Sequence, residues 1–254
     1  VRETFIRINS QGMRVDAADR AFARASRLNL RSMVRELQGR FSNGFERVAR
    51  STILQTIALA LGHRDLGERG IDAMVTKLES EDDERARFER IWPKLRDAFC
   101  SAADFLLELG VPNFDFLPSE PMFTILTLFF YHSGGPRPTR SAKVLLRKWF
   151  WATAVGARYS GRGYRPNLMA DATFAAKLGG RGTAKLLPMA KVSVHMLRQT
   201  DYSRPGPLSN AFFCLLRALK PRFLEDGAEI PVEDISSRAN RNDKHHIFPR
   251  ALLS

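Results

Sequence analysis

Apolar residues recur at the spacing of an α-helix through most of this 254-residue chain, and this periodicity constrains the fold more than any other feature. Asp16 is placed to cap the first helix. We predict helices over residues 17–26, 45–61, 80–109, 121–131, 139–157, 166–178 and 207–219. Pro93 should kink or divide the third of these, because proline lacks the N–H group that a helix interior uses. The sequence therefore predicts a mainly α-helical fold.

The two ends of the chain depart from the helical pattern. Phe5 to Ile8 predicts a strand, and Asn9 to Gly12 a turn that leads into the first helix. After Glu225 the helical periodicity gives way to short extended pieces and a polar loop from Ser236 to Asp243. We expect an α+β unit to begin there. The first residue is Val1, and the sequence stops before such a unit could complete a core, so we expect a part of a longer protein.

Cysteine usage and hydropathy indicate the cellular compartment in which this chain would work. Cys100 and Cys214 are the only cysteines and form no CxxC pair, which excludes a disulfide framework and a thiolate zinc site built from them. A reducing, cytoplasmic setting fits this usage best. The longest apolar stretch, Phe123 to Tyr131, is about half the roughly 20 residues that a membrane-spanning helix requires. We therefore expect no membrane partner.

The net charge of +13 is concentrated in one segment, which we call the basic stretch, residues 134–185. It contains eleven Lys or Arg and a single acid, Asp171. A solvated basic face is one explanation. Interleaved aromatic rings favour nucleic-acid binding, since cations neutralise phosphates while rings stack on bases; alternatively, Trp149 and Trp151 belong to the core. The predicted DNA-binding residues are Lys143, Arg147, Lys148, Arg158, Arg162 and Arg165.

A histidine pair near the end of the sequence carries the clearest catalytic pattern. His245 and His246 follow a polar loop and precede Ile247-Phe248-Pro249. This string resembles the first segment of an HNH endonuclease, and the resemblance implies phosphodiester hydrolysis, which needs a base that works near neutral pH and a divalent cation that stabilises charge on the phosphate. Imidazole, with a pKa of about 6.5, serves as the base or as a metal ligand. The alternative is a pair of histidines at an exposed strand end.

Three segments, in the same order as in the family, resemble the GmrSD-type restriction proteins. Phe5-x-Arg7-Ile8-Asn9-Ser10-x-Gly12 with its following helix is similar to that family's second motif. Trp149-Phe150-Trp151-Ala152 and Ala157-Arg158-Tyr159-Ser160-Gly161 resemble its helical connector. His245-His246-Ile247-x-Pro249 is similar to the first strand of an HNH endonuclease, the ββα-metal fold.

The resemblance implies a restriction enzyme directed against foreign, modified DNA. Residues 1–62 would be the end of a ParB-like α/β nucleotide-binding domain, residues 63–224 a helical connector with a basic DNA-binding surface, and residues 225–254 the start of an HNH α+β domain. His245 would be the ligand of Mg²⁺ or a similar divalent cation, and His246 the general base. The residues implied to line a nucleoside triphosphate or phosphate site are Arg7, Asn9, Ser10 and Gly12.

The chain lacks some of the family's motifs. The upstream Asp-Gly-Gln-Gln-Arg-like string is missing, and so are the later Asn and final His of an HNH site. We therefore expect this chain alone not to cut DNA. An ordinary strand-to-helix turn is the alternative for the N-terminal motif, and a homo-oligomer is compatible with the sequence. The alternative function is a non-catalytic, basic helical module that binds nucleic acid.

Overall fold

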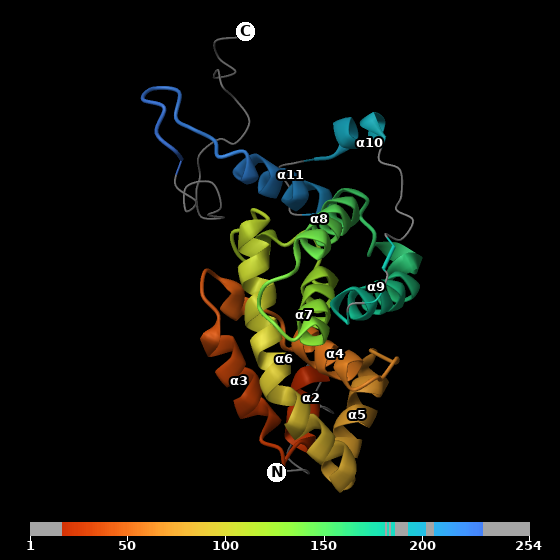
Figure 1. Ribbon diagram of the computed structural model, residues 1–254. Coiled ribbons are helices and arrows are strands. Elements are labelled where there is room, and N and C mark those ends of the chain that lie inside the picture. The colour runs from red at the N-terminus through yellow and green to blue at the C-terminus, as the bar shows by residue number, and fades with distance from the viewer. Residues whose placement is uncertain (1–16, 181, 183, 186–192, 202–205, 231–254) are drawn as a thin grey trace, which may run out of the picture.

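A computed structural model describes residues 17–180, 182, 184–185, 193–201 and 206–230 (Figure 1). Within these ranges the chain is mainly α-helical, as predicted, and contains no β-strand beyond one isolated bridge. The helices are α2 (Ala17–Arg24), α3 (Leu30–Arg40), α4 (Arg50–Ala60), α5 (Glu68–Ser80), α6 (Asp82–Glu108), α7 (Pro121–Ser133), α8 (Arg140–Val155), α9 (Tyr164–Gly179), α10 (Val194–Gln199) and α11 (Pro207–Ala218). Short 3₁₀ turns lie at Phe45–Arg47, Phe114–Phe116 and Gly161–Gly163.

Helix α7 lies at the centre of the fold. All its residues from Pro121 to Phe130 are buried, and α6, α9 and α4 pack around it (Figure 1). The ring of Phe123 lies 5.8–6.2 Å, centroid to centroid, from the rings of four other phenylalanines, which are Phe41, Phe45, Phe99 and Phe114. Aromatic pairs at this separation add stability beyond their buried area. A helix that is apolar all round is stable only when other helices cover every side, which is the position α7 occupies.

Helix α6 runs without a break through Pro93. We predicted that Pro93 would either kink or divide this helix, and the structure excludes the division. A proline inside a helix costs about 3 kcal/mol, but the buried face of α6 continues on both sides of it, with Phe88 and Trp92 before and Leu95 and Phe99 after. Burying each such side chain contributes about 1.5–3 kcal/mol, so packing outweighs the cost of the proline.

The helix predicted over residues 45–61 begins later than expected. Phe45–Arg47 forms a 3₁₀ turn, Val48 is extended, and α4 starts at Arg50. Phe45 and Val48 are both buried, and the side chain of Gln38 donates to the Val48 carbonyl at 2.9 Å. Tertiary contacts thus stabilise a turn where apolar spacing alone predicted a helix.

One apolar core connects the helices on both sides of residue 62. Ile53 and Ile57 of α4 belong to the same buried cluster as α6 and α7, and Thr56 Oγ1 lies 3.0 Å from Thr124 Oγ1 across the α4–α7 contact. The described part of the predicted first unit therefore shares its core with the predicted connector. None of the described helices is both long and apolar enough to span a membrane.

Helix α11 packs against α8 and touches the turn that follows α6 (Figure 1). That turn contains Gly110 in a left-handed conformation, with φ at +93°. A Cβ atom at Gly110 would lie only 2.7 Å from the carbonyl oxygen of Cys214 in α11. Glycine is required here for both reasons, since L side chains disfavour this conformation and the two backbones meet directly.

Candidate nucleic-acid interface

Helix α8 has one buried face and one charged face. Thr139 caps the helix by accepting a hydrogen bond from the Ala142 N–H at 3.3 Å. The buried residues are Ala142, Leu146, Trp149, Phe150, Thr153 and Ala154. Arg140, Arg147 and Lys148 are exposed and, at 100° per residue, lie on the opposite side of the helix. Burial of the apolar stripe therefore directs these three cations to solvent.

These three cations, which we call the α8 basic face, form no ion pair with any residue that the structure describes. Lys143, at the edge of this face, differs because its Nζ lies 2.5 Å from Glu108 Oε2. Exposed cations without acidic partners are available to bind phosphate groups. The structure thus brings Arg140 together with two of the predicted DNA-binding residues, Arg147 and Lys148, and places a third, Lys143, beside them.

Arg158 has a different environment from the one predicted for it. Its Nε and Nη2 atoms donate to the two carboxylate oxygens of Asp171 at 2.9 and 3.0 Å, and the Tyr159 hydroxyl donates to the same carboxylate at 2.5 Å. The Arg158 side chain is 11% exposed and that of Asp171 is fully buried. A bidentate, buried guanidinium is committed to its carboxylate. Arg158 is therefore part of the folded interior and does not belong to an exposed DNA-binding surface.

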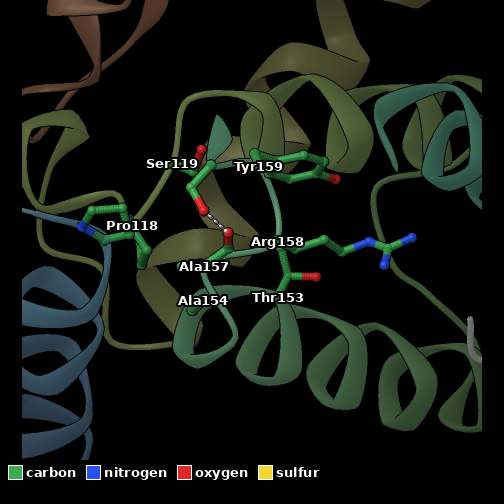
Figure 2. Close-up of a pocket in the computed structure, with 9 residues that line it drawn as sticks. Pro118, Ser119, Thr153, Ala154, Ala157, Arg158 and Tyr159 are labelled. Atoms are coloured by element: carbon green, nitrogen blue, oxygen red, sulfur yellow. Dashed lines mark hydrogen bonds between the residues drawn. The ribbon is translucent and has the colours of Figure 1, made fainter. Parts of the chain in front are cut away.

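Two side-chain hydrogen bonds to backbone carbonyls stabilise the turn between α8 and α9. Ser160 Oγ donates to the Ala157 carbonyl at 2.6 Å, and the Arg158 side chain extends away from Pro118 and Ala157 (Figure 2). The side chain of Asn167 donates to the Arg158 carbonyl at 2.8 Å. The cavity beside this turn has a volume of about 40 Å³, which accommodates water but not a nucleobase.

The aromatic residues of the basic stretch are mostly in the core. Trp149, Phe150 and Tyr159 are buried, whereas Trp151 and Tyr164 are half-buried. The interpretation that these rings stack on bases is therefore wrong for the three buried ones, because they fill the space between α8 and its neighbours. Burial, together with the Asp171 carboxylate, raises the pKa of Tyr159 well above its ordinary value of 10. Its hydroxyl therefore stays protonated and continues to donate.

The remaining predicted DNA contacts do not join the α8 basic face. Arg165 is exposed in the first turn of α9, where it lines a cleft shared with the α4–α5 loop. Arg162 lies in the 3₁₀ turn Gly161–Gly163, and its side chain is outside the described part of the structure.

The structure adds two basic residues that the basic stretch does not contain. Arg147 borders a cleft of about 260 Å³ between α8 and the ends of α6 and α11, and Lys220 lines the same cleft together with Arg217. Two acids, Glu108 and Glu229, also line it. The cluster Arg217 to Arg222 is visible in the sequence as a basic segment after an apolar helix, but only the packing of α11 on α8 places it next to Arg147.

The predicted catalytic and nucleotide-binding residues lie outside the described residues. These are Arg7, Asn9, Ser10, Gly12, His245 and His246. Within the described ranges, no group of three or more His, Cys, Asp or Glu side chains could hold a metal ion.

No protein-family model, curated protein or solved structure matches this chain. The likeness to GmrSD-type restriction proteins therefore stays a prediction that rests on its three sequence motifs.

Proposed function

We propose that the α8 basic face binds the phosphate backbone of DNA in a restriction endonuclease. The observation that carries this proposal is the exposure of Arg140, Arg147 and Lys148 on the side of α8 opposite its buried face, with no ion pair to any described residue. Phosphate contacts of this kind position a protein on DNA without reading its sequence. Lys220, in the adjoining cleft, extends the same surface.

The catalytic part of the proposal rests on the sequence motifs. In the full-length protein, His246 acts as the general base and His245 holds a divalent cation such as Mg²⁺, which stabilises charge on the scissile phosphate. The N-terminal residues Arg7 and Asn9 help to bind a regulatory nucleoside triphosphate. The substrate in this proposal is foreign DNA with modified bases or backbone.

Binding is tested with a triple variant of the basic face. We expect Arg140→Ala, Arg147→Ala and Lys148→Ala together to weaken binding to a DNA duplex and to reduce the salt dependence of log K by roughly one unit for each phosphate that is no longer neutralised. The matched control replaces Arg35, Arg69 and Lys77, which are also exposed, on α3 and α5, and carry the same total charge. Equal weakening in both variants would mean that only net charge matters, and the proposal would be wrong.

Catalysis is tested in the full-length protein with a metal titration. His246→Ala should lower cleavage by about a hundredfold or more at every metal concentration, because general-base catalysis contributes on this scale. His245→Ala should recover in part at high metal, since it removes a ligand. If both variants cleave at the wild-type rate, the histidine pair has no catalytic role. If the wild-type protein binds DNA but never cleaves it, the chain is a non-catalytic binding module.

A further inference from the structure

A second cleft, on α4, the α4–α5 loop and α9, carries two arginines. Its volume is about 190 Å³. Its lining residues are Gln55, Arg64, Leu66, Gly67, Tyr164, Arg165, Leu168 and Met169. We call it the α4–α9 cleft. It is separate from the α8 basic face, none of whose residues lines it.

The α4–α5 loop approaches Arg165 of α9 at Gly67. Helix α4 ends in a turn at Gly62, whose φ is +86°, and Gly67 precedes α5 in an ordinary extended conformation, with φ at −73°. A Cβ atom at Gly67 would lie 2.9 Å from Nη2 of Arg165. The missing side chain at Gly67 therefore allows the Arg165 guanidinium to lie against the loop backbone.

The charges at the α4–α9 cleft are positive. Arg64 and Arg165 are both exposed, neither forms an ion pair with the described residues, and no acid lines the cleft. Two acids nearby have hydrogen-bond partners of their own. Asp65 Oδ1 accepts from the Gly67 N–H at 3.0 Å, and Glu120 Oε2 accepts from the Thr52 hydroxyl at 2.7 Å. Neither carboxylate forms an ion pair with Arg64 or Arg165 among the described residues, so both guanidinium groups are available to an anion from solution.

Tyr164 is a neutral, half-buried aromatic residue in the lining of the same cleft. Burial, and then the Glu120 carboxylate, raise the pKa of its phenol above 10, so the hydroxyl keeps its proton at neutral and mildly alkaline pH. Leu168 is buried and Met169 is half-buried, which gives one side of the cleft an apolar surface. Two cationic forks beside an apolar side form a site for an anion attached to a less polar group.

We infer that the α4–α9 cleft binds a phosphomonoester group. A phosphomonoester carries a charge of about −1.5 to −2 near neutral pH and offers three strong acceptor oxygens. Guanidinium forks match such oxygens in bidentate geometry. The cleft volume of about 190 Å³ admits a phosphate with a small attached group. The phosphomonoester comes from a free mononucleotide or from the 5′-phosphate end of a DNA strand.

Calorimetric titration with inorganic phosphate and with adenosine monophosphate tests the site at fixed pH and ionic strength. We expect Arg64→Ala and Arg165→Ala each to weaken binding about tenfold or more, because each removes a charged donor. Gly67→Ala should weaken it severalfold without changing any charge, since its Cβ displaces the Arg165 guanidinium. The matched control is Arg69→Ala, an exposed arginine in the first turn of α5 that does not line the cleft.

The source of the phosphate is tested with short single strands that do or do not carry a 5′-phosphate. Tighter binding of the phosphorylated strand, abolished in Arg165→Ala, identifies a strand end, whereas binding of the mononucleotide alone identifies a free nucleotide. The triple variant of the α8 basic face should keep its affinity for phosphate, so this proposal can fail or succeed independently of the proposed DNA-binding function. It is overturned if the wild-type protein binds none of these phosphomonoesters, or if Arg69→Ala weakens binding as much as Arg64→Ala and Arg165→Ala.

Discussion

Two groups of cations from the same basic stretch differ completely in their surroundings. Arg140, Arg147 and Lys148 are exposed on α8 and form no ion pair within the described residues, whereas Arg158 is 11% exposed and bound to the buried Asp171. All four side chains are basic and come from the same segment of the sequence, but their burial and their ion-pair partners differ. A count of basic residues therefore predicts that a surface is positive, and the three-dimensional partners decide which of those residues can meet a ligand.

The largest effect is expected from removing the carboxylate of the buried pair. Asp171→Ala leaves the Arg158 guanidinium buried without its partner, which should lower the free energy of unfolding by about 3–5 kcal/mol. Urea unfolding at neutral pH measures this change.

A double replacement sharpens the same comparison. Arg158→Met with Asp171→Leu removes both charges and should restore part of the stability that Asp171→Ala loses, because a buried ion pair and an apolar pair of similar volume are often close in free energy. The restoration is partial because the buried Tyr159 hydroxyl still lacks its acceptor. The opposite result would contradict this expectation. In that result, Asp171→Ala changes the free energy of unfolding little and the double variant lowers it strongly.

A smaller effect is expected at the hydroxyl of Tyr159. Tyr159→Phe removes one hydrogen bond to a charged group and should lower the free energy of unfolding by about 1.5–3 kcal/mol. The pKa of Tyr159 is raised in the folded state, so its contribution is complete below pH 10. It is lost as the pH rises further, because the unfolded chain releases the proton first, with a slope of at most about 1.4 kcal/mol per pH unit.

Unfolding curves between pH 8 and 11 separate this contribution from the titration of other groups. The difference in stability between wild type and Tyr159→Phe should shrink above pH 10. A difference that stays constant over this range would show that the tyrosine does not titrate with a raised pKa.

The smallest change in stability is expected at the exposed pair Lys143–Glu108. Lys143→Ala should change the free energy of unfolding by about 0.2–1 kcal/mol, since both side chains are solvent-exposed and water screens their attraction. Glu108→Gln should leave stability nearly unchanged and strengthen DNA binding slightly, because it releases Lys143 to the α8 basic face. Weaker DNA binding in Glu108→Gln would show that Lys143 does not contribute to that surface.

Local signals in the sequence predict the strongest helices. Pro121 begins α7 and Thr139 caps α8, as expected from residues that favour helix starts. The predicted set omits α3, α5 and the short α10. In α5, Ile71, Met74 and Val75 are buried at helical spacing, so the signal is present in the sequence, although charged residues are interspersed with it.

The sequence alone could not predict which cations of the basic stretch form buried ion pairs and which are exposed. Arg158 and Asp171 are 13 positions apart and meet only because α9 packs on α7 and carries Asp171 into the core. One signal was available, since Asp171 is the only acid among eleven basic residues and a lone acid in such a segment is a candidate for a buried partner. Which of the eleven it pairs with depends on tertiary structure.

The contact at Gly110 sets a limit on how this protein can change during evolution. The side chains between α8 and α11 can be exchanged for others of similar volume, because apolar cores tolerate such swaps. The approach of Gly110 to the Cys214 carbonyl involves backbone atoms and leaves no room even for a methyl group. Lineages of this protein can therefore exchange side chains between α8 and α11 within these volume limits, whereas the close approach of α11 to the end of α6 persists only where position 110 stays glycine.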